Sequence, residues 1–184
     1  LLKSAESSIP YIMFADQDDV WHPDKTEQTL AMMKQTETEF PGQPVLCHSD
    51  LRVVTDNLQV ISESFEQYQS LNCGKKEFRH LMIQNNITGC TVMINRPLAD
   101  IASFPDGAVC HDWYLGLTAS AFGKIAYSRT ALIDYRQHQN NCYGAVPRKK
   151  LLAGFFARKH LQERVEATQI QAETFLRQYD QNLS

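Results

Sequence analysis

The sequence predicts an α/β protein in which helices flank a mostly parallel sheet. Apolar runs of strand length alternate with amphipathic runs of helix length along most of the chain, which is typical of α/β layers. Turn residues separate these runs, as in "PGQP" at 41–44 and "TDNLQ" at 55–59. With 184 residues the chain can form one domain with an appendage, and we expect a domain over 1–147 and a helical extension over 148–184.

The first half of the chain predicts two strands and two helices. "SIPYIMFA" at 8–15 has the apolar run of a buried strand, and Pro23 opens a helix that runs to about Thr38, with Asp24 and Glu27 in its first turn. "VLCHSDLRVVT" at 45–55 predicts the second strand. Residues 61–74 lack periodicity and predict a loop, whereas "KKEFRHLMIQN" at 75–85 predicts a short amphipathic helix.

The second half continues the alternation. A buried strand is predicted from about Cys90 to Ile94, a helix from near Pro97, and another helix over "HDWYLGLTASAF" at 111–122. Residues 123–138 predict two short strands around a turn at 128–129. The tail from 148 to 179 predicts one or two long helices, whose mostly apolar stripe consists of Leu161, Val165, Thr168, Ala172, Phe175 and Tyr179.

Composition excludes several classes of protein. Apolar residues make up 43% and charged residues 21%, as in soluble globular domains, and the net charge of −3 lacks the basic excess of a nucleic-acid-binding protein. No apolar run approaches the roughly 20 residues of a membrane span, and "LLKSAESS" does not resemble a signal peptide. The five cysteines are scattered, which argues against a disulfide framework or a structural zinc site and favours the cytoplasm. Cys90 is interpreted as a small core residue.

The most informative stretch is "YIMFADQDDVW" at 11–21, because Asp16, Asp18 and Asp19 crowd together after an apolar run. Like charges this close disfavour one another's ionisation. A water-facing turn would relieve the repulsion, since aspartate is common in turns. A hard divalent cation, Mg²⁺ or Mn²⁺, would also relieve it. The stretch follows the carboxyl end of a strand, where α/β proteins bind ligands, and this favours the cation.

Three later stretches carry further candidate residues. In "NNITGCT" at 85–91, Gly89 would allow backbone to approach a ligand, or would simply serve a turn. Asp112 opens a predicted helix, either as a reactive carboxylate or as a first-turn acid that interacts with the helix dipole. Arg136 and His138 follow a predicted strand, where His138 could equally be a surface histidine.

Together, the ordered motifs D-x-D-D-x-W, N-x-x-T-G-C-T, H-D-W and Y-R-x-H resemble the family 2 glycosyltransferases of the GT-A fold. The bacterial rhamnosyltransferase-like branch is the most similar, over about Tyr11 to Gly144. The resemblance implies a partial GT-A fold over 1–147. It also implies an enzyme that moves a sugar from a dTDP- or UDP-sugar donor to a hydroxyl of a saccharide or lipid-linked acceptor during cell-surface polysaccharide synthesis.

The resemblance also assigns roles on the donor side. Asp16 and Asp18 would contact the nucleotide, and Arg136 would pair with its phosphate oxygens. Asp18, Asp19 and His138 would hold Mg²⁺ or Mn²⁺. Such an ion stabilises the charge that develops on the departing nucleoside diphosphate, and it removes the repulsion among the three aspartates.

On the acceptor side, Asp112 matches the base of a single inverting displacement. Many relatives carry Glu-Asp at this point, whereas this chain has His111-Asp112. Gly89, His111 and Trp113 are assigned to contact with the sugar or the acceptor, although Trp113 fits a core position equally well. Trp21 is expected to fill the core.

One departure from the family concerns the beginning of the chain. Relatives open with a strand and loop of the "V-S-I-x-x-P-x-Y-N" kind, which is missing before Leu1, so we expect an N-terminally truncated domain that is inactive alone. The alternative is a non-catalytic sugar-binding or assembly module that keeps the family fold. A glycoside hydrolase is disfavoured, because paired catalytic carboxylates need no D-x-D-D cluster.

The start of the tail, "RKKLLAGFFARKH" at 148–160, mixes basic and apolar residues. Such a helix packs on its own domain or on a second copy, or it lies on an anionic membrane surface. We expect packing. Peripheral contact with the inner face of the cell membrane and a homo-oligomer formed through this helix are the alternatives.

Overall fold

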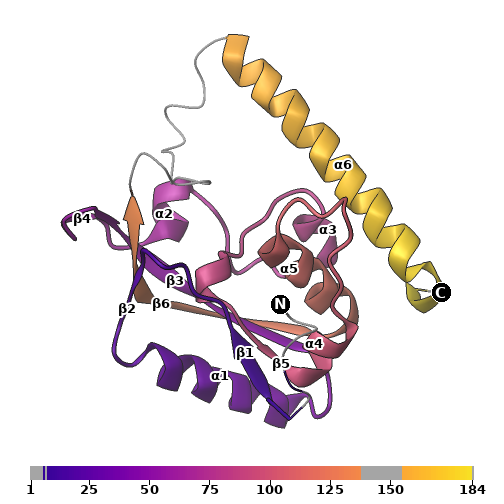
Figure 1. Cartoon of the computed structure of the whole chain (residues 1–184), viewed down its shortest axis with the longest axis horizontal. Helices are drawn as coiled ribbons and strands as arrows, with labels where there is room; N and C mark the ends of the chain where they lie inside the picture. The colour runs from indigo at the N-terminus through magenta and orange to yellow at the C-terminus, as the bar shows by residue number, and fades with distance from the viewer. Residues whose placement is uncertain (1–5, 7, 138–154, 184) are drawn as a thin grey trace.

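The protein is an α/β structure built on one mixed sheet that is flanked by helices (Figure 1). The structure is a computed structural model and describes residue 6 and residues 8–137 and 155–183. The strands lie in the order β1-β5-β3-β6-β2, and β4 pairs with β3. Their bounds are β1 Tyr11–Met13, β2 Val20–Trp21, β3 Val45–Thr55, β4 Val60–Ser62, β5 Met93–Asn95 and β6 Lys124–Gln137.

The prediction of a mostly parallel sheet is not confirmed, because only β3 and β6 pair in parallel within the described sheet. β5 runs antiparallel to both of its neighbours, β1 and β3, and β2 runs antiparallel to β6. The chain between β3 and β6 forms a long crossover, and β5 returns through the sheet inside it. The direction of each strand depends on this path of the chain. Apolar periodicity in the sequence does not indicate the path, so it could not predict the directions.

The helices and one 3-10 turn follow most of the predicted pattern. Their bounds are α1 Lys25–Glu39, α2 Phe65–Gln69, α3 Phe78–Leu81, η2 Gly89–Thr91, α4 Arg96–Ile101, α5 His111–Phe122 and α6 Phe155–Leu183. β3 and α5 have the predicted bounds, and α1 begins two residues after Pro23.

Three local predictions are wrong. Residues 61–74 include β4 and α2, because Ser64 caps α2 and the buried Asp50 carboxylate accepts bonds from two of its first N–H groups. β6 is one strand whose pairing shifts register opposite Ser49 and Asp50, not two strands around a turn. The strand expected from Cys90 begins at Met93, since the preceding residues form η2.

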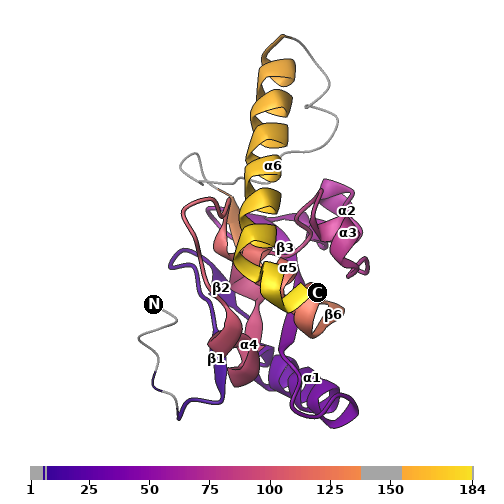
Figure 2. The ribbon, with the colours of Figure 1, turned by 90° about the vertical axis from the view of Figure 1, so that its right-hand side faces the viewer.

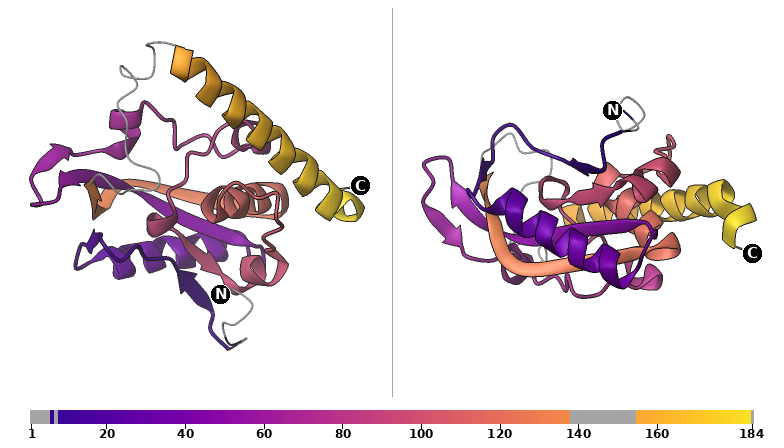
Figure 3. Two further views of the ribbon diagram at one scale, coloured as in Figure 1. Left: turned by 45° about the horizontal axis from the view of Figure 1, so that its top comes forward. Right: turned by 90° about the horizontal axis from the view of Figure 1, so that it is seen from below.

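The core lies on both faces of the sheet (Figure 3). On one face, α1 packs Met33 against Val45, Cys47 and Met93. On the other, a larger cluster joins the sheet to α3, α4, α5 and α6, and includes Leu46, Leu81, Ile94, Leu98, Tyr114, Leu115, Leu117, Phe175 and Tyr179. This cluster fixes α5, and therefore its first turn, against the sheet.

The C-terminal part of α6 packs on the domain (Figure 2). Phe175 and Tyr179 are buried, and Gln171 accepts a hydrogen bond of 2.9 Å from the backbone N–H of Val109. Val165, on the predicted stripe, is 57% exposed, so among the side chains that the structure describes the contact lies toward the C-terminal end of the helix. α6 therefore contributes directly to the core of the domain. The packing expected of residues 148–160 stays a prediction, because residues 148–154 and the side chains of 155–160 lie outside what the structure describes.

None of the helices in the described segments is long and apolar enough to cross a membrane.

Candidate functional site

The acidic turn between β1 and β2 is anchored at both ends by the sheet. β1 pairs with β5, and the backbone N–H of Phe14 continues that pairing to Val92. β2 pairs with β6, and beyond it the backbone N–H of Arg136 donates a bond of 3.1 Å to Oδ1 of Asp19. The turn with Asp16, Asp18 and Asp19 therefore occupies a fixed place beyond the carboxyl end of β1.

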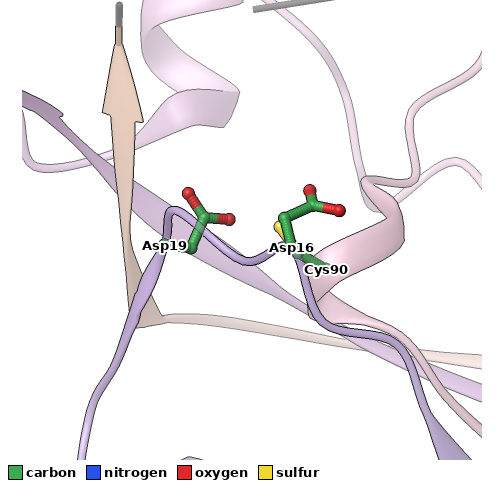
Figure 4. A group of neighbouring side chains, drawn as sticks. All are labelled: Asp16, Asp19 and Cys90. Carbon is green, nitrogen blue, oxygen red and sulfur yellow. The ribbon is translucent and has the colours of Figure 1, made fainter.

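Asp16, Asp19 and Cys90 form a compact group at this turn (Figure 4). One carboxylate oxygen of each aspartate and the Cys90 sulfur lie within 4.8 Å of one another. Cys90 comes from η2 and is buried, whereas Asp16 is exposed. The thiol therefore lies beside both carboxylates. Figure 4 shows the two carboxylates pointing to the same side of the turn.

Burial and mutual repulsion shape the charges of this group. Burial raises the pKa of Asp19 to about 6, and the charges of Asp16 and Asp18 add to this rise, against hydrogen bonds from Arg136 and Cys90. The pKa of Asp16 is also raised, by burial and by the charge of Asp18, with a smaller contribution from Asp112 that His111 opposes. The ionisation of Asp16 is thus affected both by the acidic turn and by the start of α5.

Asp112 is held in one orientation by three hydrogen-bond donors. Its Oδ2 accepts from the backbone N–H of Gly89 at 2.9 Å, and its Oδ1 accepts from Asn85 Nδ2 at 3.2 Å and from the Trp113 backbone at 2.6 Å. A Cβ at Gly89 would lie 2.7 Å from His111 Nε2, so a side chain at position 89 would displace the His111 ring. The exposed His111 ring packs against Phe14, with ring centroids 5.3 Å apart.

The structure therefore brings together most of the predicted site residues: Asp16, Asp18, Asp19, Gly89, His111, Asp112 and the backbone of Arg136. The ring of Trp113 does not lie among them, although its backbone N–H bonds to Asp112. Trp113 is 8% exposed and its indole N–H donates to the carbonyl of Leu81 in the core, so its ring offers almost no surface to a sugar. His138 lies outside the described residues, and so does the shared metal site that was predicted with it.

Four contributions were missed by sequence reasoning. Cys90 is a core residue, as predicted, but its sulfur also lies within 4.8 Å of carboxylate oxygens of Asp16 and Asp19. Asn85 orients Asp112, and Phe14 supports His111. Lys25 is fully buried with its ammonium 3.8 Å from the centre of the Trp21 ring. The N-x-x-T-G-C-T motif contains two of these residues, but no periodicity in it distinguishes a ligand-facing side chain from a core one.

Two carboxylates of the acidic turn fit a hard cation. Oδ2 of Asp19 is buried and meets no hydrogen-bond donor within the described part of the chain, as expected of an oxygen that awaits a ligand. Asp16 and Asp19 could hold Mg²⁺ or Mn²⁺, which prefer oxygen ligands, whereas Asp18, a predicted ligand, is not in the group whose donor atoms lie within 4.8 Å of one another. Such an ion would stabilise the ionised form of Asp19 against the effects that now raise its pKa.

Open depressions lie elsewhere on the surface. One, of about 460 Å³, lies beside α2 and is lined by Glu66 and Arg129. Another, of about 450 Å³, lies between Phe78 and Lys124. Neither borders the acidic turn, and neither gathers reactive groups like those around Asp16.

Comparison with protein families and with curated proteins gives no match: no family model and no curated protein matches this chain.

Proposed function

We propose that this protein is a family 2 glycosyltransferase of the GT-A fold. It would move a sugar from a nucleoside-diphosphate donor, such as a UDP- or dTDP-sugar, to a hydroxyl of a saccharide or lipid-linked acceptor. The observation that supports this best is the position of η2, where Gly89 donates to Asp112 on α5 and the next residue, Cys90, lies beside Asp16 and Asp19 of the acidic turn. The carboxylates proposed to bind the cation and the oriented carboxylate of Asp112 thus lie in one small region.

The acidic turn fits the donor side of the reaction. A bound Mg²⁺ or Mn²⁺ would supply charge stabilisation for the departing nucleoside diphosphate. Asp16 and Asp18 would orient the nucleotide, and Asp19 is held in place by the backbone of Arg136. The Arg136 guanidinium would pair with phosphate oxygens.

Asp112 fits the role of general base. Its three hydrogen bonds fix the carboxylate, which reduces the reorganisation needed when it accepts a proton from the acceptor hydroxyl. His111 and Phe14 form a ring pair beside it that would contact the acceptor. A lipid-linked acceptor would bring the enzyme to the cytoplasmic face of the membrane.

Donor turnover tests the proposal, with water replacing the unidentified acceptor. The full-length protein is incubated with UDP- and dTDP-sugars, and release of the nucleoside diphosphate is measured with Mn²⁺ and with EDTA. We expect release that requires the metal and that falls at least about 100-fold in Asp112→Asn, since general-base catalysis contributes about 10²–10⁴-fold. Donor affinity, measured by calorimetry, should change less than about threefold.

Asn85→Ala is the matched control, because it removes a donor to Asp112 but leaves the carboxylate. We expect it to lower turnover less than Asp112→Asn does. Equal turnover in wild type and Asp112→Asn would show that Asp112 is not the general base. If the donor does not bind in a metal-dependent way, the proposed glycosyltransferase function is wrong.

A non-catalytic sugar-binding module is the second candidate. The three hydrogen bonds of Asp112 join η2 to α5, so the carboxylate also has a structural role that requires no chemistry. This candidate predicts saccharide or donor binding without any release of nucleoside diphosphate.

A further inference from the structure

We propose that Asp16, Asp19 and Cys90 form a binding site for Zn²⁺, a thiophilic cation that the transfer reaction does not use. The inference depends on the thiol, not on the aspartates alone. Zn²⁺ binds cysteine sulfur and carboxylate oxygen together, whereas Mg²⁺ and Mn²⁺ select oxygen. The proposal concerns metal binding only and stands whether or not the chain transfers sugars.

The distances suit three ligands of one ion. The donor atoms lie within 4.8 Å of one another. A tetrahedral ion with bonds of about 2.0–2.3 Å needs its ligands about 3.3–3.8 Å apart. Side-chain rotation that closes the group by about 1 Å is therefore enough. Asp16 is exposed, so the fourth position opens to water.

Cys90 points into this group from a buried position. Its side chain is 1% exposed, and its sulfur lies within 4.8 Å of one carboxylate oxygen of Asp16 and one of Asp19. A single S–H proton cannot serve both carboxylates well, because thiols are weak donors. The buried Oδ2 of Asp19 has no donor within the described residues. One dication would satisfy all of these groups.

The chemistry of binding is an exchange of proton for metal. The Cys90 S–H bond breaks, its electron pair forms the S–Zn bond, and the proton goes to solvent. Burial and the charges of Asp19 and Asp16 raise the pKa of the Cys90 thiol, against the smaller effect of the Lys25 charge, and a bound dication would oppose this rise. Asp18 adds a further negative charge to the group. The three aspartates outnumber this one lysine, so the local charge attracts a cation.

Co²⁺ is the probe, because it replaces Zn²⁺ in such sites and a Co²⁺–thiolate bond absorbs in the near ultraviolet. The full chain is freed of metal with EDTA, dialysed and titrated without oxygen. We expect one equivalent of Co²⁺ to produce the thiolate band with release of a proton, and one equivalent of Zn²⁺ to remove the band by displacing Co²⁺. No sugar nucleotide is present, so failure of the proposed transfer reaction would leave this readout unchanged.

Cysteine variants identify the sulfur. Cys90→Ser should abolish the band and weaken Zn²⁺ binding at least about tenfold, whereas Cys110→Ser and Cys142→Ser should keep it. Asp16→Asn keeps the buried thiol and should weaken binding at least about tenfold, so it tests the site even if Cys90→Ser unfolds. A wild-type chain without the band, or a band that survives in folded Cys90→Ser, would overturn the proposal.

Discussion

The backbone N–H of Gly89 donates a hydrogen bond of 2.9 Å to Oδ2 of Asp112, and this bond joins η2 to the first turn of α5. The two residues are 23 positions apart, and each comes from a different motif of the sequence. The bond leaves so little space that the His111 ring would touch a side chain at position 89. The site therefore depends on a glycine for its spacing and on an aspartate for its charge.

Gly89→Ala should change the site more than it changes stability. The new Cβ would meet the end of the exposed His111 side chain, which can rotate away, so we expect a loss of about 1 kcal/mol or less in the free energy of unfolding. Rotation of His111 should break its contact with Phe14. Urea unfolding and the NMR signals of the His111 ring measure the two effects.

Gly123→Ala is the contrasting variant. A Cβ there would lie 2.0 Å from the backbone oxygen of Pro44, which cannot rotate away, so we expect a loss of about 3 kcal/mol. If Gly89→Ala is equally costly, the ring of His111 is held more firmly than its exposure indicates.

Asp19→Asn should stabilise the metal-free protein at neutral pH. The folded pKa of Asp19, about 6, lies above the ordinary value of 3.8, so its contribution to stability is present below pH 3.8 and is lost as pH rises through 6. Because the carboxyl is only half-buried, solvent screens the effect, and we expect about 1 kcal/mol, or about 2–4 °C in melting temperature.

Thermal unfolding in EDTA at pH 4 and pH 8 measures this effect. The gain should be present at pH 8 and nearly absent at pH 4. Asp56→Asn, at an exposed position after β3, controls for loss of one negative charge. A gain at pH 4 that equals the gain at pH 8 would contradict the assigned cause.

The fold could be predicted where one local signal was decisive. α5 has apolar side chains at helical spacing and β3 is a long apolar run, so both have the predicted bounds. α2 could not be predicted, because its first turn is stabilised by Asp50, a residue in another element. The direction of β5 was equally inaccessible, since it depends on the path of the chain and not on periodicity.

The candidate site could be predicted where charge was concentrated. Asp16, Asp18 and Asp19 repel one another in any fold, and this made the turn conspicuous in the sequence. Cys90 and Trp113 show the limit of such reasoning. Both lie in apolar stretches, yet the Cys90 thiol faces two carboxylates while the Trp113 ring turns into the core. Only packing distinguishes them.

His48→Phe should make the protein more resistant to acid. His48 is 1% exposed, its Nε2 meets no hydrogen-bond partner among the described residues, and burial lowers its pKa to about 3. The unfolded chain binds the proton near pH 6.5, so stability from neutral His48 is lost as pH falls from 6.5 toward 3, by about 1.4 kcal/mol per pH unit.

Urea unfolding at pH 7 and pH 5 tests this expectation. The variant should gain about 2 kcal/mol over wild type between these two values, and its ring can keep the contact with Tyr127, at 4.8 Å between centroids. His80→Phe, at a half-exposed position, is the control. Parallel pH profiles for wild type and His48→Phe would show that His48 is protonated in the folded protein.

Phe175→Ala tests whether α6 belongs to the core of the domain. Phe175 is fully buried and its ring lies 5.5 Å from Tyr114 on α5 and 4.7 Å from Tyr179. Removing it leaves a cavity, so we expect a loss of about 3–5 kcal/mol in the free energy of unfolding. Leu176→Ala is the matched control, because Leu176 is 48% exposed on the same turn and should cost about 0.5 kcal/mol or less. If the two variants cost the same in urea unfolding, α6 does not pack on the domain in solution, and its apolar residues are free to meet a second copy or a membrane surface.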